Sequence, residues 1–183
     1  SLFVVFCFLA GLGSTVWAGV KEIGVPAVQN FQRAVYNAGT QNWWSAQGDN
    51  GIMYFANNSG LVRFDGQFWS LHTVPNGSNL RVLHYSTDQQ RLYVGAFNDF
   101  GYFTNDSIGS LKYVSLMDRV PPEHRSFGDV WRIHEASWGV VFQAFEGLYF
   151  FKNDTIEVVK PRSEFHFSYY VNGVLYVFDR SNG

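Results

Sequence analysis

The sequence has little cysteine, little charge and no long apolar segment. Its one cysteine is Cys7, 15% of the residues are charged, and the formal net charge is −2. A single thiol excludes disulfides within the chain and zinc sites built from several thiolates. The weak negative charge provides no basic surface for nucleic acid or an anionic membrane. The apolar run from Leu2 to Leu12 is shorter than the roughly 20 residues of a membrane-spanning helix.

Catalytic motifs are also absent from the sequence. It contains no nucleophile elbow, no phosphate-binding glycine loop and no HExxH zinc motif. Carboxylates that could serve as an acid and a base lie in or beside predicted turns, where they bond to their own backbone: Asp65, Asp99, Asp129, Asp179 and Glu146. We therefore predict no catalytic residue and no cofactor in this segment. A glycan lyase or hydrolase is the enzymatic alternative.

Three histidines occupy similar positions in three predicted strands. They are His84 in "RVLH", His134 in "WRIH" and His166 in "SEFH", and three imidazoles together could bind a metal. Repeated units reuse the same residue types, however, and the first strands of different blades diverge in space. We therefore predict no metal site.

Residues 1–18 have the pattern of a secretory signal peptide. The apolar run is followed by small residues and by Val16, Trp17 and Ala18, which fit the small-x-small pattern of signal peptidase sites. We expect cleavage after Ala18 and export of residues 19–183. Cys7 would be removed with the signal, so the mature chain would have no cysteine nucleophile. A buried strand or a signal anchor is the alternative.

Aromatic residues are abundant, at 19% of the chain, and this content favours packed β-sheets. Four segments share an aromatic strand, a short polar turn and a glycine: "IMYFANNSG", "LYVGAFNDFG", "VVFQAFEG" and "VLYVFDRSNG". The four glycines, Gly60, Gly101, Gly147 and Gly183, are separated by roughly 40 residues, which is the size of a four-stranded propeller blade.

The repeated units contain the other strands that a blade needs. Runs such as "LVRFDG" and "QFWSLH" follow the first glycine, and "NWWSAQ", "LRVLHYS", "VWRIHEA" and "EFHFSYY" precede the four aromatic strands. One hairpin cannot bury its apolar face alone, whereas stacked copies can. We predict an all-β fold, a β-propeller with about four blades in residues 19–183. A β-sandwich is possible, but it gives no reason for the repeat.

The fourth repeated unit is incomplete, which predicts that these residues are part of a larger propeller. Propellers close with about four to eight blades, and the fourth unit reaches Gly183 before its third strand. We expect an N-terminal fragment of a longer propeller. Residues 25–31 alternate apolar and polar positions and are predicted to be an outer strand that completes the last blade.

Blade geometry predicts a ligand site. In a propeller, the loop leading into each first strand and the turn between the second and third strands lie on one face. We expect this face to collect ligand-binding residues that are mostly polar: Gln41, Asn42, Trp43, Asn57, Asn58, Asn79, Arg81, Asn98, Asp99 and Glu146, with Trp44 and Phe97 at the border. Planar amides and a guanidinium suit sugar hydroxyls or uronate carboxylates, and aromatic faces pack on pyranose rings.

Three segments resemble a known family of sensors. Residues 24–69, "RLYVGAFNDFGYF" from Arg91 to Phe103, and "FGDVWRIHE" from Phe127 to Glu135 are similar to the periplasmic sensor propellers of bacterial two-component and hybrid regulators whose receptor ends in a triple-tyrosine domain. The resemblance covers nearly all of the mature chain and is most specific between Gly24 and Phe103.

The resemblance implies an extracytoplasmic, ligand-sensing domain of a membrane signalling receptor. In that family two seven-bladed propellers and a β-sandwich face the periplasm, a membrane helix follows, and the output is a histidine kinase or, in relatives, a LuxR-type helix-turn-helix that regulates transcription. Many members respond to a glycan or its breakdown product. The implied receptor is an inner-membrane homodimer when full length. The alternative is a secreted propeller that serves as a protein-interaction platform without signalling output.

Overall fold

The computed structural model describes residue 24 and residues 28–181. The predicted signal peptide, residues 1–18, lies outside the described residues, as do residues 19–23, 25–27 and 182–183. The chain from Phe31 onward belongs to one unit, to which the following description applies.

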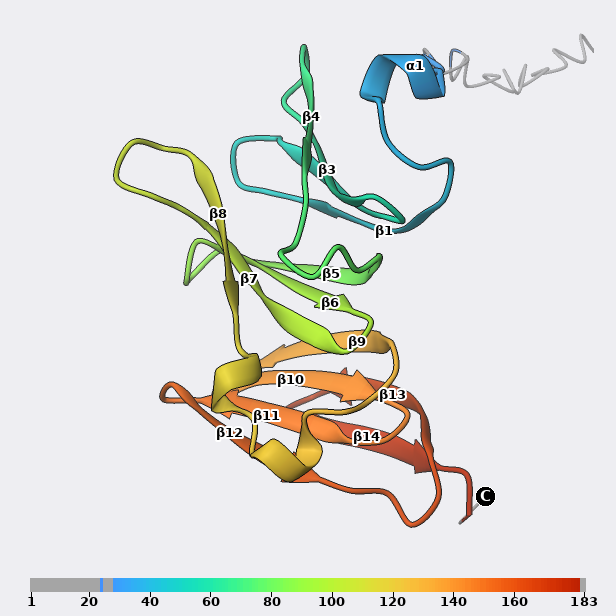
Figure 1. Ribbon diagram of the computed structural model, residues 1–183, viewed down its shortest axis with the longest axis vertical. Helices are drawn as coiled ribbons and strands as arrows, with labels where there is room; N and C mark the ends of the chain where they lie inside the picture. The colour runs from blue at the N-terminus through green and yellow to red at the C-terminus, as the bar shows by residue number, and fades with distance from the viewer. Residues whose placement is uncertain (1–23, 25–27, 182–183) are drawn as a thin grey trace, which may run out of the picture. The chain divides into compact units, whose positions relative to one another are not determined.

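Fourteen strands form three four-stranded sheets and one two-stranded sheet (Figure 1). The first sheet contains β1 (Asn42–Gln47), β2 (Met53–Asn57), β3 (Gly60–Phe64) and β4 (Trp69–His72). The second contains β5 (Leu80–Ser86), β6 (Arg91–Ala96), β7 (Asp99–Asn105) and β8 (Leu111–Ser115). The third contains β9 (Val130–Ala136), β10 (Gly139–Ala144), β11 (Leu148–Lys152) and β12 (Thr155–Val159). The fourth pairs β13 (Phe165–Val171) with β14 (Val174–Asp179).

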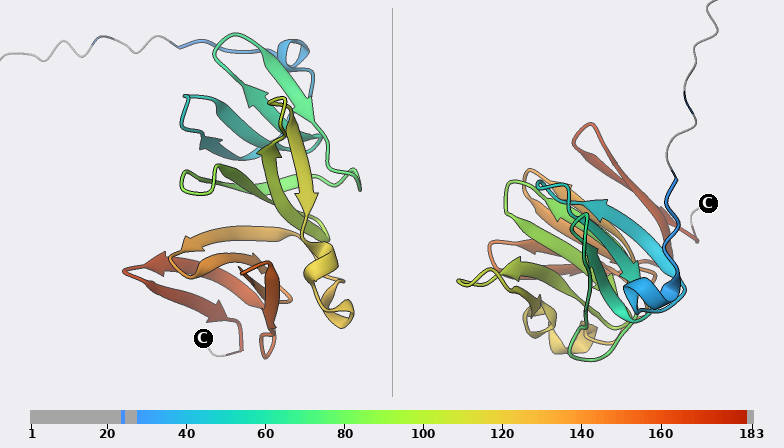
Figure 2. Two further views of the ribbon diagram at one scale, coloured as in Figure 1. Left: turned by 90° about the vertical axis from the view of Figure 1, so that its left-hand side faces the viewer. Right: turned by 90° about the horizontal axis from the view of Figure 1, so that it is seen from above.

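Every sheet is an antiparallel meander in which neighbouring strands follow the chain order. The first strands of successive sheets lie side by side, β1 next to β5 and β5 next to β9 (Figures 1 and 2). The later strands extend away from this line, as the strands of propeller blades do. The all-β prediction is confirmed, and the sheets have a blade-like arrangement. The number of blades in a closed ring stays a prediction.

Short helical segments connect or flank these sheets. They are α1 (Arg33–Tyr36) before β1, and two 3-10 turns, η1 (Met117–Arg119) and η2 (Pro122–His124), between β8 and β9. Phe31 packs with its ring centroid 5.0 Å from that of Trp69. The prediction of an outer strand over residues 25–31 is not supported by its described part, because residues 28–31 are not in a strand. No helix among residues 24 and 28–181 is both long and apolar enough to cross a membrane.

The core lies between the sheets. Alternate residues of each strand face the next sheet, so Leu61 of the first sheet joins a buried cluster with Leu92 of the second. Between the second and third sheets, the ring centroids of Phe100 and Phe142 are 4.5 Å apart and the rings are stacked. A third cluster joins Val141 to Phe165 of the fourth sheet. Each sheet therefore buries its apolar face only by contact with its neighbours, which is the reason for the repeat.

Two of the repeated glycines are required by close backbone approach. A Cβ atom on Gly101 would lie 2.1 Å from the carbonyl oxygen of Val114 on the neighbouring strand. A Cβ on Gly60 would lie 2.5 Å from the carbonyl oxygen of His72, and Gly60 has a φ of +126°. Glycine is the residue that tolerates both conditions.

Candidate functional site

Each first strand carries a β-bulge near its start. Asn42 pairs with Asn57 and Trp44 with Ala56, which leaves Trp43 as an extra residue on β1. The same shift occurs on β5 at Arg81, on β9 at Trp131 and on β13 at His166 and Phe167. A bulge redirects the side chain of the extra residue relative to its strand. Four equivalent positions thus present side chains that regular pairing would direct elsewhere.

The side chains at three of these bulges contact one another. The Arg81 guanidinium carbon lies 4.3 Å from the ring centroid of Trp43 and 5.7 Å from that of Trp131. The two indole rings approach edge to face at 6.0 Å, and the Trp131 ring stacks on Phe145 at 6.0 Å. Phe145 in turn lies 5.9 Å from His166. The bulges therefore produce a row of aromatic rings with one guanidinium between them, which we call the bulge cluster: Trp43, Arg81, Trp131, Phe145 and His166.

A partly buried ion pair holds Arg81 in place. Its Nε donates to Asp129 Oδ1 at 2.9 Å, with about 15% of the arginine and 19% of the aspartate side chain exposed. Its Nη1 donates at 3.4 Å to Asn58 Oδ1, which also accepts from Trp43 Nε1 at 2.7 Å. Two of the five guanidinium N–H groups are used in this way, so Arg81 retains donors while its charge is balanced by Asp129.

The Asn57 side chain holds the loop before β1 in place beside the bulge cluster. It is fully buried, and its Oδ1 accepts from the backbone N–H groups of Gly39 and Ser59, each at 2.9 Å. Its Nδ2 donates to Gly39 O at 2.8 Å and to Asn42 Oδ1 at 2.7 Å. The next residue, Asn58, donates from its backbone to Gln41 O at 3.2 Å. The loop before β1 and the β2–β3 turn therefore lie together, as blade geometry predicted.

The structure brings six of the ten predicted site residues into contact: Gln41, Asn42, Trp43, Asn57, Asn58 and Arg81. Asn79 lies in the loop leading into β5, two residues before Arg81. Glu146 is exposed in the β10–β11 turn, beside Gly128. Placement beside the bulge cluster does not itself test ligand binding, which stays a prediction for all ten residues.

Asn98 and Asp99 have structural environments that turn chemistry alone did not reveal. Asn98 has a φ of +51°, its N–H donates to Gly128 O at 3.0 Å, and its Oδ1 accepts from Phe127 N at 3.1 Å. It thereby anchors the loop that carries Asp129. Asp99 is buried, and Ser115 Oγ donates to its Oδ1 at 2.9 Å. Its side chain therefore faces the blade interior, whereas Asn98 is exposed.

Burial raises the pKa of the Asp99 carboxyl above its ordinary value, and the bond from Ser115 only partly offsets this. The raised pKa means that the folded state retains the proton to a higher pH than the unfolded state does. Asp99 therefore favours folding below the unfolded pKa and loses this effect as pH rises through the folded pKa. We expect Asp99→Asn to change Tm more favourably at pH 7 than at pH 3, measured by thermal melts at both values.

Asp65 provides a control of opposite sign. It is exposed, and the backbone N–H groups of Phe68 and Gln67 lower the pKa of its carboxyl. Asp65→Asn should therefore change Tm less favourably at pH 7 than at pH 3. A pH-independent difference between wild type and Asp99→Asn would contradict the burial argument.

Trp131, Asp129 and Arg132 were not predicted as site residues. The sequence pattern assigns Asp129 to a turn. The signal was available in the repeat, because Trp131 follows the first residue of "VWRIHEA" as Arg81 follows that of "LRVLHYS" and Trp43 that of "NWWSAQ". A column-by-column comparison of the four units would have selected Trp131.

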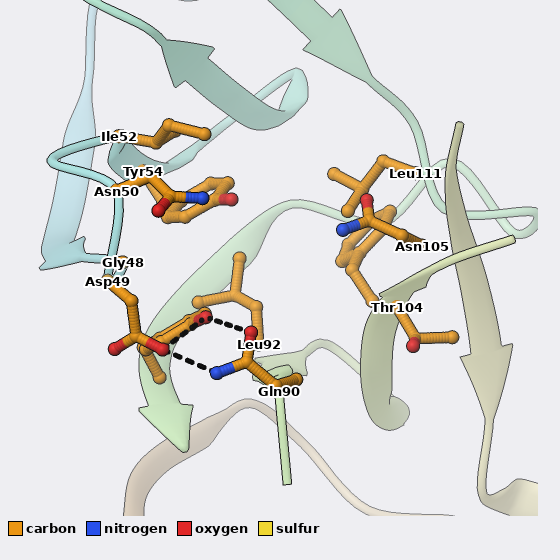
Figure 3. A pocket seen from close by; sticks show the side chains of 12 residues that line it. Gly48, Asp49, Asn50, Ile52, Tyr54, Gln90, Leu92, Thr104, Asn105 and Leu111 are labelled. Atoms are coloured by element: carbon orange, nitrogen blue, oxygen red, sulfur yellow. Dashed lines mark hydrogen bonds between the residues drawn. The ribbon is translucent and has the colours of Figure 1, made fainter. Parts of the chain in front are cut away.

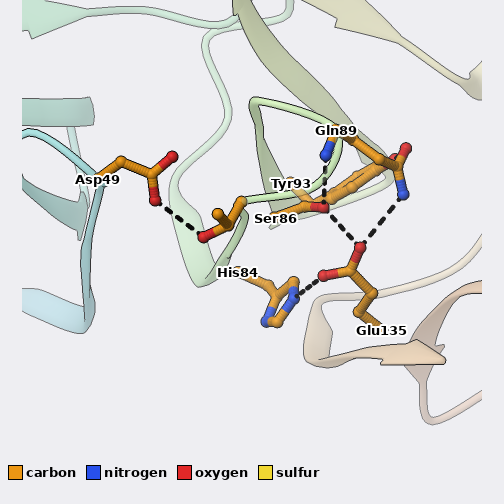
Figure 4. A network of polar contacts seen from close by, with 7 residues as sticks. Asp49, His84, Ser86, Gln89, Tyr93 and Glu135 are labelled. Carbon is orange, nitrogen blue, oxygen red and sulfur yellow. Dashed lines mark hydrogen bonds and ion pairs between the residues drawn. The ribbon is translucent and has the colours of Figure 1, made fainter. Parts of the chain in front are cut away.

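Side chains of the first strands also form hydrogen bonds between neighbouring sheets (Figure 4). Glu135 accepts hydrogen bonds from Ser86 Oγ at 2.5 Å, His84 Nε2 at 2.8 Å and Gln89 Nε2 at 3.2 Å. Burial opposes its ionisation, but the bonds from Ser86 and His84 lower the pKa of the Glu135 carboxyl overall. His134 Nε2 is 2.7 Å from Ser168 Oγ on β13.

These contacts give His84 and His134 roles in holding neighbouring sheets together. In the part of the chain that the structure describes, no group of three His, Cys, Asp or Glu residues is placed to hold a metal ion.

A small pocket lies at the opposite end of β1 from Trp43 (Figure 3). Its volume is about 60 Å³. Asp49 in the β1–β2 loop accepts from Thr87 Oγ1 at 2.8 Å and from Tyr85 Oη at 3.3 Å, and it also accepts from Gln90 Nε2. The pocket is too small for a sugar ring. The bonds that Asp49 accepts join the first sheet to the second. A larger open groove of about 300 Å³ borders the bulge cluster, lined by Asn42, Trp43, Trp44, Ser45 and Phe55.

Solved structures share this fold. The chain superposes with a TM-score of 0.58 and 18% identity on what is described as the extracellular domain of a hybrid two-component system, BT4673 from B. thetaiotaomicron, and 77% of this chain matches 19% of that one. A second structure of BT4673, described as a one-component system, matches equally. The extracellular domain of the hybrid two-component system BT3049 from the same organism matches 81% of this chain and 20% of its own, with a TM-score of 0.59 and 11% identity.

These likenesses show the fold of the chain. It spans about one fifth of the length of the matched chains. No protein-family profile matches the sequence, and no curated protein sequence matches it with statistical significance.

Proposed function

We propose that this chain is part of the extracytoplasmic ligand-sensing domain of a membrane signalling receptor, and that its ligand is a glycan or a glycan breakdown product. The bulge cluster is the observation that carries the proposal. It places two indole rings and a guanidinium at adjacent first-strand bulges, beside the amides of Asn42 and Asn58. Bulges redirect side chains in this way beside functional sites. The fold likeness to extracellular domains of two-component systems supports a sensory role and an extracytoplasmic location.

The chemistry of the bulge cluster suits a sugar. Trp43 is 37% exposed, so part of its indole face is open to a ligand while its Nε1 is held by Asn58. Carbohydrate rings have an apolar face that packs on aromatic rings, and their hydroxyls exchange hydrogen bonds with amides and guanidinium groups. We propose that the chain binds this ligand without converting it chemically. A kinase or a helix-turn-helix output, a further propeller, a membrane helix and dimerisation belong to the same proposal for the full-length protein.

Binding of oligosaccharides to the full-length protein tests this function. We expect a screen by thermal shift and isothermal titration to find a glycan that binds, and Trp131→Ala to weaken that binding about tenfold, or 1.4 kcal/mol. The reason is the loss of the indole face and of its contact with Arg81.

Trp138→Ala is the matched control. Trp138 lies in the β9–β10 turn, at the opposite end of β9 from Trp131, and stacks on Phe150 at 5.7 Å. Its removal should leave glycan affinity unchanged. Binding only to proteins, with no oligosaccharide bound, would favour the interaction-platform alternative instead.

A further inference from the structure

The described first strands carry two arginines in different electrostatic environments. Arg81 on β5 pairs with Asp129 at 2.9 Å. Arg132 on β9 is the residue next to the bulge at Trp131, and its side chain is half-buried. Among residues 24 and 28–181, no carboxylate oxygen lies within 4 Å of the Arg132 guanidinium. Within the described residues, Asp129 therefore balances the charge of Arg81, and no carboxylate balances that of Arg132.

Two contacts hold Arg132 in place without neutralising it. Its Nη1 donates to the carbonyl oxygen of Trp131 at 3.0 Å, and its guanidinium carbon lies 5.4 Å from the ring centroid of Trp44. Contact with an aromatic face orients a guanidinium and leaves its in-plane N–H groups available. No described residue bonds to Nε or Nη2 of Arg132, so both can make the paired hydrogen bonds that planar anions accept.

The charge of Arg132 also acts on a neighbouring group. Burial, then the charge of Arg132, lowers the pKa of the His134 imidazole. A partly desolvated charge without a partner is costly to maintain, so a bound anion would relieve this cost.

We infer that Arg132 recognises an acidic group of the ligand, a carboxylate or a sulfate, while the indole rings of the bulge cluster contact its sugar ring. This inference rests on the proposed glycan-sensing function and narrows the ligand to acidic saccharides. Arg81 takes a different role, because Asp129 balances its charge: it positions Trp43 and Trp131 and keeps its remaining donors for sugar hydroxyls. The proposed contact with an acidic group is thereby assigned to Arg132, and hydrogen bonding to the ligand stays a prediction for Arg81.

Oligosaccharides of matched backbone separate charge recognition from sugar recognition. The probes are three oligosaccharides of different backbone. Each is prepared in three forms, as the neutral sugar, the C6 carboxylate and the 6-O-sulfate. All nine are titrated into the full-length protein. We expect at least one acidic form to bind about tenfold or more tightly than its neutral counterpart. The advantage should shrink as salt concentration rises, because ions screen the charge.

Variants assign the preference to a residue. Arg132→Gln should remove the difference between acidic and neutral forms, and Arg132→Lys should keep part of it because a point charge remains. Arg91→Gln is the matched control: Arg91 also has no carboxylate oxygen within 4 Å in the described residues, and its guanidinium carbon lies 4.3 Å from the Tyr102 ring. Arg91→Gln should keep the full preference.

The possible outcomes distinguish the inference from the function on which it rests. A preference for only one of the two acidic forms supports the inference and identifies the group. Equal binding of acidic and neutral forms, or a preference that survives Arg132→Gln or disappears in Arg91→Gln, overturns the inference while leaving glycan sensing intact. If none of the nine oligosaccharides binds, and the wider screen finds no glycan, the proposed function and this inference both fall.

Discussion

Replacing Phe142 by alanine is expected to destabilise the chain by about 3–5 kcal/mol, a large part of the roughly 5–15 kcal/mol that keeps a domain folded. Phe142 is fully buried on β10 and stacks on Phe100 at 4.5 Å, with Tyr93 at 5.9 Å edge to face. The substitution removes the Phe142 ring from the contact between the second and third sheets and leaves a cavity there. The cavity cannot close easily, because its walls belong to separate sheets.

Amide hydrogen exchange in the intact protein measures this effect locally. Faster exchange is expected in β6, β7, β10 and β11, which line the cavity. Phe68→Ala is the control, since Phe68 is 65% exposed and its removal leaves no cavity. Unchanged exchange in β10 of the Phe142 variant would show that the two sheets do not depend on this contact.

Replacing Asn57 by alanine is expected to cost about 2–4 kcal/mol and to release the loop before β1, because several buried groups lose their partners together. The N–H and carbonyl groups of Gly39, the N–H of Ser59 and the amide of Asn42 all bond to this one side chain. The loop packs so closely that a Cβ on Gly39 would lie 2.9 Å from Asn57 Oδ1. Water must enter the space to satisfy these groups.

In the Asn57→Ala variant we expect rapid hydrogen exchange of the Gly39 and Ser59 amides and proteolytic cleavage near residue 39. Asn76→Ala is the control, because Asn76 also accepts a backbone bond, from Ser78 N at 3.0 Å, but is exposed, so water can replace it. Asn57→Asp adds a second comparison, since it keeps the acceptor and loses both donor bonds. Equal effects of the Asn57 and Asn76 substitutions would contradict the role of burial.

The strands were largely predictable because their signals are local. "NWWSAQ", "LRVLHYS" and "VWRIHEA" match the bounds of β1, β5 and β9. Alternating apolar residues and turn-forming Asn, Asp and Gly determine such hairpins over a few neighbouring residues. The stacking of sheets followed from the repeat, since each unit has an apolar face that only another unit can cover.

The side-chain environments of the site were less predictable, because they depend on register. Asn98 and Asp99 are adjacent residues of similar chemistry, yet Asn98 lies in the β6–β7 turn and is exposed, whereas Asp99 begins β7 and is buried. The bulges at Trp43, Arg81 and Trp131 add one residue each, and a shift of one residue changes the face on which a side chain lies. The ion pair of Arg81 with Asp129 joins residues 48 positions apart, and no local pattern indicates such a pair.

The bulge on each first strand has a consequence for how specificity could diversify. The extra residue lies outside the pairing of its strand, so its side chain can change without altering the hydrogen bonds that hold the sheet together. Tryptophan, arginine, tryptophan and histidine already occupy these positions in the four units. A library randomised only at residues 43, 81, 131 and 166 would therefore sample many recognition surfaces on one unchanged scaffold, as the variable positions of an antibody loop do.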